Sequence, residues 1–145
     1  MYKHILLPTD GSELSARAID AGVGLAKSLG ARLTALNVTP PYYPEGGNPS
    51  TFVQQSRAHA ERSEATARQA LDYPARKASE AGVPCAPLHR VADAPWQEII
   101  KAAGDQGCDL ILMASHGRRG VAALLLGSET HKVLTHSKTP VLVVR

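Results

Sequence analysis

Apolar residues along the chain follow two alternating patterns, which predict strands that alternate with helices. Short apolar runs without helical spacing are typical of strands buried on both faces. The predicted strands are residues 3–7, 32–38, 85–91, 110–113 and 141–144. Segments with apolar residues at helical spacing lie between them, at residues 12–29, 51–81, 93–103 and after Gly127. This order predicts an α/β fold: an open five-stranded parallel sheet with helices on both faces.

Capping and breaking residues set the expected boundaries of these helices. Ser12 is predicted to be the N-cap of the first helix, and Gly30 follows its end. Asp93 is predicted to cap the third helix. Pro74 lies inside the second helical segment, so we expect a kink or a break near Asp72.

The stretch from Asp109 to Ser128 combines a buried strand, a glycine-bearing loop and a helix start. Nine residues separate Gly117 from the pair Gly127-Ser128, and Ser128 is expected to be the helix N-cap. The first N–H groups of such a helix attract phosphate, because they have no partner in the helix and carry partial positive charge. No Lys follows a glycine as a Walker loop requires. The stretch therefore predicts a phosphate site of another kind.

A strand order of 3-2-1-4-5 connects these strands with right-handed crossovers only. Ligands of open α/β sheets bind beyond the carboxyl ends of the strands, where the order reverses. Asp10 then faces the loop Ser115-His116-Gly117 across a cleft, and Val38 at the second strand's exit forms a third wall. The N–H and C=O groups of Val38 are placed to read an adenine edge.

Composition narrows the class of protein. The 145 residues are 43% hydrophobic and 20% charged, as expected of one globular domain spanning residues 1–145. Aromatic residues make up 4% and the net charge is +3 with dispersed basic residues, which argues against nucleic-acid binding. No apolar run approaches membrane-spanning length, and Met1 leads directly into a strand, so a cytoplasmic protein without a membrane partner is expected.

The two cysteines and the six histidines carry no ligand-like spacing, so no metal site is expected from them. The predicted strand order places Cys85 and Cys108 three strand spacings apart. That is roughly 14 Å, beyond the reach of a disulfide. Both cysteines are therefore expected to be free thiols.

Several candidate site residues have two possible roles. Asp10 can cap its own turn or contact a ribose or a metal. Arg118 and Arg119 are either solvated loop charges or phosphate clamps. Glu129 lies in a first helical turn, where the helix dipole favours it, but it would repel a bound triphosphate unless it turns outward or shares a cation. Because the cleft shows no nucleophile elbow, paired carboxylates or Cys-His pair, the pattern favours binding over catalysis.

These motifs together resemble the universal stress protein (UspA) family over essentially the whole chain. The resemblance is carried by KHILLPTDGSELSARAI, the MASHGRRG loop, the GSETHKVL helix start and the TPVLVV ending. The family's nucleotide motif is Gly, two residues, Gly, nine residues and Gly-Ser or Gly-Thr. Here it is represented by Ala114 to Gly117 and by Gly127-Ser128. The resemblance implies a Rossmann-like, adenine nucleotide alpha hydrolase-like sheet of order 3-2-1-4-5.

The same resemblance implies an adenine nucleotide as ligand: ATP, or AMP or ADP, with magnesium as a candidate companion ion. The last strand, Val141 to Val144, is the edge of the predicted sheet and contains no charge or proline, so we expect it to pair with its own copy in a homodimer, which the resemblance also favours. The contacts with the adenosine would come from Pro8, Thr9, Asp10 and Val38. The ribose and phosphate contacts would come from Met113, Ala114, Ser115, His116, Gly117, Arg118, Arg119, Gly120, Gly127, Ser128, Glu129 and Thr130.

Two departures from the family pattern bear on affinity. Ala114 replaces the first glycine and is accommodated only where φ is negative. Glu129 replaces a residue that is often apolar.

Three hypotheses follow. The first is an ATP-binding, dimeric stress-response module with slow or no hydrolysis. The second is a dimeric interaction protein of the same fold without tight nucleotide binding. The third, an adenylyltransferase or ATP pyrophosphatase, would need HxGH or SGGxDS beside the first helix, where this chain has TDGSELS.

Overall fold

The computed structural model describes residues 1–117 and 126–145. The first half of the chain forms β1 (His4–Pro8), α1 (Glu13–Leu29), β2 (Arg32–Thr39), the 3-10 turn η1 (Pro49–Thr51) and α2 (Phe52–Ala81). The second half forms β3 (Cys85–Val91), α3 (Pro95–Asp105), β4 (Leu110–Ala114), α4 (Ser128–His136) and β5 (Val141–Val144). Each predicted strand is present, with bounds that differ by a residue at most at either end.

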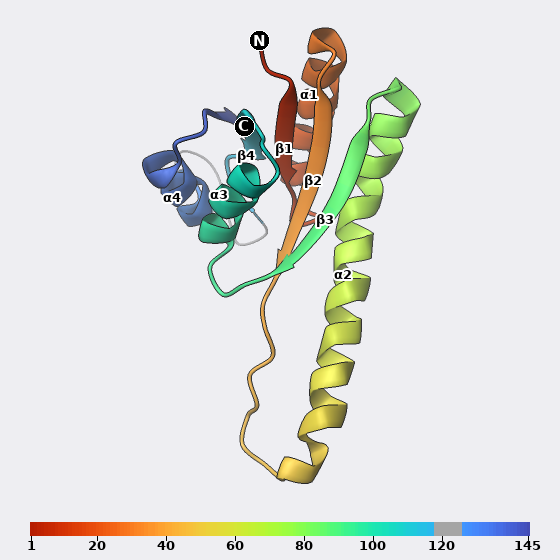
Figure 1. Cartoon of the computed structure of the whole chain (residues 1–145), viewed down its shortest axis with the longest axis vertical. Coiled ribbons are helices and arrows are strands. Elements are labelled where there is room, and N and C mark those ends of the chain that lie inside the picture. Colours follow the sequence, from red (N-terminus) through yellow and green to blue (C-terminus); the bar gives the residue numbers. More distant parts are fainter. Residues whose placement is uncertain (118–125) are drawn as a thin grey trace.

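The five strands form one parallel sheet in the order β3-β2-β1-β4-β5. This confirms the predicted order and places β1 and β4 side by side at the centre. Helices α1 and α2 cover one face of the sheet, and α3 and α4 cover the other (Figure 1). The carboxyl ends of β1 and β4 therefore meet at the same edge, where the switch in strand order predicts a ligand site.

Alternate residues of the central strands fill two separate cores. Ile5 and Leu7 of β1 pack on the α1 face. Leu6 points to the other face, where it packs with Ile99 of α3 and Val133 of α4. Both faces of β1 and β4 are thus apolar, as expected for strands at the centre of a parallel sheet.

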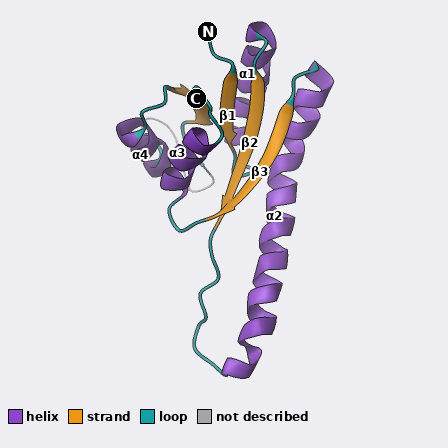
Figure 2. Ribbon diagram, viewed as in Figure 1, coloured by secondary structure: helices purple, strands orange, loops and turns teal. Residues whose placement is uncertain are grey.

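Helix α2 runs without interruption through Pro74, so of the kink or break predicted near Asp72 the break is wrong. Proline removes one helical hydrogen bond, but the side chain of Pro74 is fully buried against the rest of the fold. That burial offsets the lost bond. The N-terminal end of α2 extends beyond the sheet, and the long loop that leaves β2 leads to it (Figure 2).

The other helix boundaries are partly as predicted. Ser12 caps α1 by accepting from the Ser15 N–H at 3.2 Å, and Gly30 ends α1 with a left-handed φ of 66°. Asp93 does not cap α3. The N-cap is Ala94, and the Asp93 carboxylate instead accepts a hydrogen bond from the Tyr43 hydroxyl.

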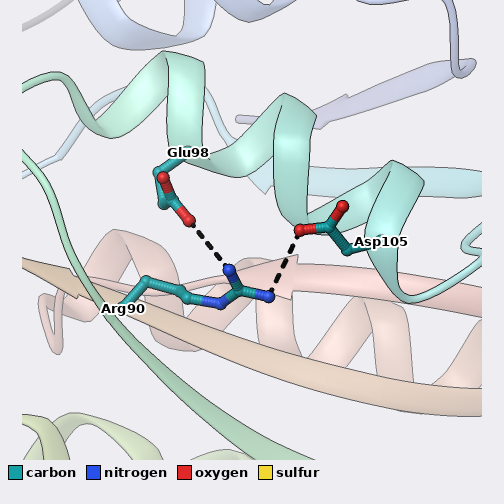
Figure 3. Close-up of polar contacts among 3 residues, drawn as sticks. All are labelled: Arg90, Glu98 and Asp105. Carbon is teal, nitrogen blue, oxygen red and sulfur yellow. Dashed lines mark hydrogen bonds and ion pairs between the residues drawn. The ribbon is translucent and has the colours of Figure 1, made fainter.

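Arg90 connects β3 to α3 on one face of the sheet. Its guanidinium lies between the carboxylates of Glu98 and Asp105, at 3.3 Å and 3.5 Å (Figure 3). The Arg90 side chain is 26% exposed, so solvent screens both ion pairs in part. They orient α3 on the sheet more than they add stability.

Both cysteines are free, as the strand order predicts. Within the described part of the chain, every helix is too short or too polar to span a bilayer.

His4 is the titratable side chain of β1, and it is buried. Its Nε2 lies 2.7 Å from the Thr34 hydroxyl, while Nδ1 has no hydrogen-bond partner. Burial lowers the pKa of His4 below 6.5, and the charge of Arg32 lowers it further, against the opposing influence of Asp109. The folded protein therefore favours neutral His4.

We predict that the free energy of unfolding falls as the pH drops below 6.5. In that range the unfolded chain takes up a proton at His4 that the folded chain does not. Urea unfolding at pH 7.5, 6.5 and 5.5 measures the slope, and the variant His4→Gln should show a shallower one. An equal slope in both proteins would mean that other groups cause the pH dependence.

Candidate functional site

The chain leaves β1 through a tight turn that also starts α1. Asp10 Oδ1 accepts hydrogen bonds from the Ser12 N–H at 2.9 Å and from the Ser15 hydroxyl at 2.7 Å. The Thr9 N–H donates to the Leu36 carbonyl at 2.8 Å, which extends the β1–β2 pairing by one residue. Asp10 is thus a turn-capping residue, as one of its two predicted roles requires.

The other oxygen of the Asp10 carboxylate lies against Gly117. A Cβ at position 117 would stand 2.6 Å from Asp10 Oδ2, much closer than side chains approach. The turn after β1 and the loop after β4 therefore face each other, as the strand order predicts. Gly117 allows this approach because it has no side chain.

The start of α4 is bonded to the end of β4. The Gly127 N–H donates to the Ser115 carbonyl at 2.7 Å, and the Ser115 N–H donates to the Val144 carbonyl of β5 at 2.8 Å. A Cβ at Gly127 would meet Ser115 O at 3.1 Å and His116 Cα at 3.3 Å. Gly127 has an ordinary φ of −59°, so its absent side chain serves the close approach of two backbones.

Ser128 is the first residue of α4, and the N-cap is Gly127, which corrects the predicted cap. The first hydrogen bond within the helix joins the His131 N–H to the Gly127 carbonyl at 2.9 Å. The N–H groups of Ser128, Glu129 and Thr130 consequently have no acceptor within α4. They form the predicted anion-attracting helix start.

Two side chains of this first turn have partners away from the helix start. The buried Thr130 donates from Oγ1 to the Ala114 carbonyl at 2.9 Å. Glu129 turns outward, and its Oε2 accepts from the Trp96 N–H of α3 at 2.8 Å. Of the two ways in which Glu129 could avoid a phosphate, the structure shows the first.

Val38 lies within β2, one residue before its end, and its backbone groups face β1. Leu36 accepts from Thr9 on the β1 side, whereas Thr39 accepts from Ala92 beyond β3, at 3.0 Å. Since neighbouring residues of a strand point their N–H and C=O groups to opposite sides, Val38 shares the direction of Leu36. β1 ends at Pro8, which pairs with Leu36, so these groups of Val38 extend past the end of β1.

The remaining predicted residues lie close by. Met113 and Ala114 are buried at the end of β4, where extended backbone has the negative φ that Ala114 needs. His116 Nδ1 lies 3.0 Å from the Ser115 hydroxyl. Arg118, Arg119 and Gly120 fall outside the described residues.

Two supporting residues were missed by sequence reasoning. Ser15 holds the Asp10 carboxylate, and the spacing Asp10-Ser12-Ser15 could have revealed it. Asn37 is a buried polar residue of β2, and its Nδ2 donates to the Thr9 carbonyl at 2.9 Å. It thereby fixes the turn from the β2 side.

A hollow of about 450 Å³ lies between α1 and α2. Its lining includes the carboxylates of Asp20 and Glu80, and Lys77 lies 3.9 Å from Asp20. These acidic groups disfavour an anion there. In the described part of the chain, no three His, Cys, Asp or Glu side chains are grouped so that they could hold a metal ion.

The family model described as "Universal stress protein family" matches residues 1–145. The chain belongs to the universal stress protein family. A curated member, universal stress protein YxiE of Bacillus subtilis, is 32% identical over the full length of both chains.

Solved structures of universal stress proteins share the fold. The MJ0577 protein superimposes with a TM-score of 0.84 at 28% identity, over 99% of this chain and 96% of its own. A universal stress protein in complex with cAMP gives a TM-score of 0.69 at 26% identity, over 99% and 97%. More distant structures of the same fold contain dAMP, in Archaeoglobus fulgidus, and AMP, in Arabidopsis thaliana. Members of the family therefore bind adenine nucleotides.

We predict that Gly117→Ala lowers the free energy of unfolding by about 1–2 kcal/mol, because the new Cβ must displace the Asp10 carboxylate from Ser12 and Ser15. Replacing Asp10 by Ala removes the group that the Cβ would meet. In that background, Gly117→Ala should cost much less. Urea unfolding of the parent, both single variants and the double variant gives the coupling free energy between positions 10 and 117. Additive effects would contradict the contact between the two loops.

Proposed function

We propose that this universal stress protein binds an adenine nucleotide, ATP, ADP or AMP, at the carboxyl edge of β1 and β4. The observation that carries the proposal is the convergence of Asp10, Gly117 and the start of α4 around one edge of the sheet. Free N–H groups at a helix start suit phosphate. The backbone of Val38, beyond the end of β1, suits the edge of an adenine.

Complexes of relatives support this choice of ligand. The family member bound to cAMP is 26% identical to this chain over almost its full length. The glycines that allow the close approaches here are the same glycines that carry the nucleotide motif, at positions 117 and 127. Their lack of side chains therefore has a direct structural reason in this fold.

We propose a binding module in the cytoplasm whose nucleotide-bound state serves the stress response, with slow or no hydrolysis. The Asp10 carboxylate faces the loop after β4. One of its oxygens already accepts hydrogen bonds from the Ser12 N–H and the Ser15 hydroxyl. That engagement makes Asp10 a poor general base for water. Magnesium belongs in the binding tests, since Asp10 is an oxygen ligand of the kind this ion prefers.

The second part of the proposal is a homodimer formed through β5. The N–H groups of Ile111 and Ser115 donate to Pro140 and Val144, so the intervening Val141 and Val143 direct their N–H groups outward. Neither Pro nor a charged residue lies within β5, which leaves this edge open to pairing with a second copy.

The opposite edge of the sheet is less suited to pairing. Leu33 donates to Pro84, and Ala92 donates to Thr39, so the odd-numbered residues of β3 face outward. Pro87 is one of them and has no N–H to donate. The asymmetry favours β5 over β3 as the dimer edge.

We predict that Gly127→Val abolishes nucleotide binding, because its side chain would push against the backbone of Ser115 and His116. Ser128→Ala should weaken binding by about 0.5–1.5 kcal/mol, the value of one hydroxyl hydrogen bond. Gly24→Val, at an α1 position where a Cβ meets nothing within 4 Å, is the matched control. Calorimetric titration with ATP and AMP, with and without magnesium, measures the nucleotide affinity of all three variants.

A thermal shift provides an independent reading. A nucleotide at a hundred times its dissociation constant should raise stability by about 2.7 kcal/mol. If the parent shows neither heat nor a thermal shift, the dimeric interaction protein without nucleotide becomes the better hypothesis. Unchanged binding by Gly127→Val would place the site elsewhere.

We predict that Val143→Pro converts the dimer to a monomer, since it removes an outward donor and leaves the bonds between β4 and β5 in place. Val143→Thr keeps the N–H and the β-branched shape, so it should stay dimeric. Light scattering of the parent and both variants gives the mass. A dimeric Val143→Pro protein would place the interface elsewhere.

A further inference from the structure

The hydrogen bonding between β1 and β2 stops one bond short of what their register allows. The Thr9 N–H donates to the Leu36 carbonyl at 2.8 Å. In a parallel ladder the next bond along would join the Val38 N–H to the Thr9 carbonyl. Among the residues that the structure describes, the Val38 N–H makes neither this bond nor another, although it faces the β1 side.

A side chain takes the Thr9 carbonyl instead. Asn37 Nδ2 donates to it at 2.9 Å. A carbonyl only accepts, so the amide nitrogen must face Thr9 and the amide oxygen must point elsewhere. Asn37 is 4% exposed, and within the described residues its Oδ1 has no hydrogen-bond partner.

This arrangement leaves two polar groups unpaired where an apolar residue at position 37 would leave none. Without the Asn37 amide, the Thr9 carbonyl could accept from the Val38 N–H and complete the ladder. With it, the chain makes one bond to Thr9 and leaves both the Val38 N–H and a buried amide oxygen without partners. Unpaired buried groups lower stability, so stability alone does not account for Asn37.

The free Val38 N–H lies beside the Val38 carbonyl, past the end of β1. Such a donor and acceptor match an edge of adenine, which offers the ring acceptor N1 beside the N6 amino donor. Hypoxanthine has N1–H and O6 in these places. In the same position its donor would meet the N–H and its acceptor would meet the carbonyl, so the base would be rejected.

We propose that Asn37 is a positioning residue that gives the site its preference for adenine. By taking the Thr9 carbonyl, it keeps the Val38 N–H free for the ring acceptor of the base. Asn37 acts through Val38 and needs no contact of its own with the ligand. This inference rests on the nucleotide site proposed above.

The first test uses the protein without nucleotide. Amide hydrogen exchange, followed by NMR, compares the parent with Asn37→Val, whose β-branched side chain suits a strand. In the parent we expect the Val38 amide to exchange at least about tenfold faster than the Leu36 amide within the ladder. In Asn37→Val the Val38 amide should become protected, because the Thr9 carbonyl is then free to accept from it. Asn37→Ala gives the same reading should valine disturb the packing.

The second test titrates AMP and inosine monophosphate, which differ only at the base edge. We expect the parent to prefer AMP by about tenfold, the value of roughly one hydrogen bond. Asn37→Val and Asn37→Ala should lose about tenfold for AMP and little for inosine monophosphate, so the preference disappears. A purely structural role of Asn37 would lower both affinities together.

Thr34→Val is the matched control. Thr34 is also a buried polar residue of β2, and its hydroxyl lies 2.7 Å from His4 Nε2, at the other end of the strand. This variant removes a buried hydrogen bond and keeps the shape of the side chain. It should change neither the ratio of the two affinities nor the exchange of the Val38 amide.

The outcomes distinguish this inference from the proposed function. If AMP binds and its ratio to inosine monophosphate is the same in the parent and both Asn37 variants, the inference is wrong and the nucleotide site stands. Protection of the Val38 amide in the nucleotide-free parent also overturns it, since the N–H would then have a partner. If the parent binds neither nucleotide, the proposed function and this inference both fail.

Discussion

The contact between the Asp10 carboxylate and Gly117 is the constraint on which the candidate site depends. The carboxylate occupies the place where any side chain at position 117 would begin. Its other oxygen fixes the start of α1 through Ser12 and Ser15. One side chain therefore sets the geometry of the turn after β1 and the distance of that turn from the loop after β4.

The start of α4 is set by bonds to the sheet more than by its own residues. Gly127 is bonded to Ser115, Ser115 to β5, and Thr130 to the last residue of β4. Because each of these bonds ends on the backbone, the orientation of the helix start follows directly from the pairing of β4 with β5. A dimer through the free side of β5 would add a further support to the same strand.

Glu129 joins this helix to its neighbour. It compensates for an uncapped helix start at α3 and leaves the N–H groups at the start of α4 to other partners. A residue that looked unfavourable for an anion site thus has a structural role of its own.

The sequence by itself indicated the fold class, a strand order that the family resemblance also implied, and the loops of the candidate site. Apolar runs and helical spacing are local patterns, and handedness rules leave few ways to connect five parallel strands. The spacing from Gly117 to Gly127 and the cap at Ser12 could be read for the same reason, since each depends on neighbours in the chain.

Tertiary structure decided the features that depend on residues far apart in sequence. Pro74 stays within a continuous helix because it is buried in the fold. The Asp93 carboxylate accepts a hydrogen bond from the Tyr43 hydroxyl and does not cap α3, which starts at Pro95. Gly127 is the cap of α4 because Ser115 accepts its N–H. Glu129 turns to Trp96 because the start of α3 lies beside it and lacks an acceptor. Local propensity cannot predict such choices, because each is made by a hydrogen bond or a packing contact with a distant part of the chain.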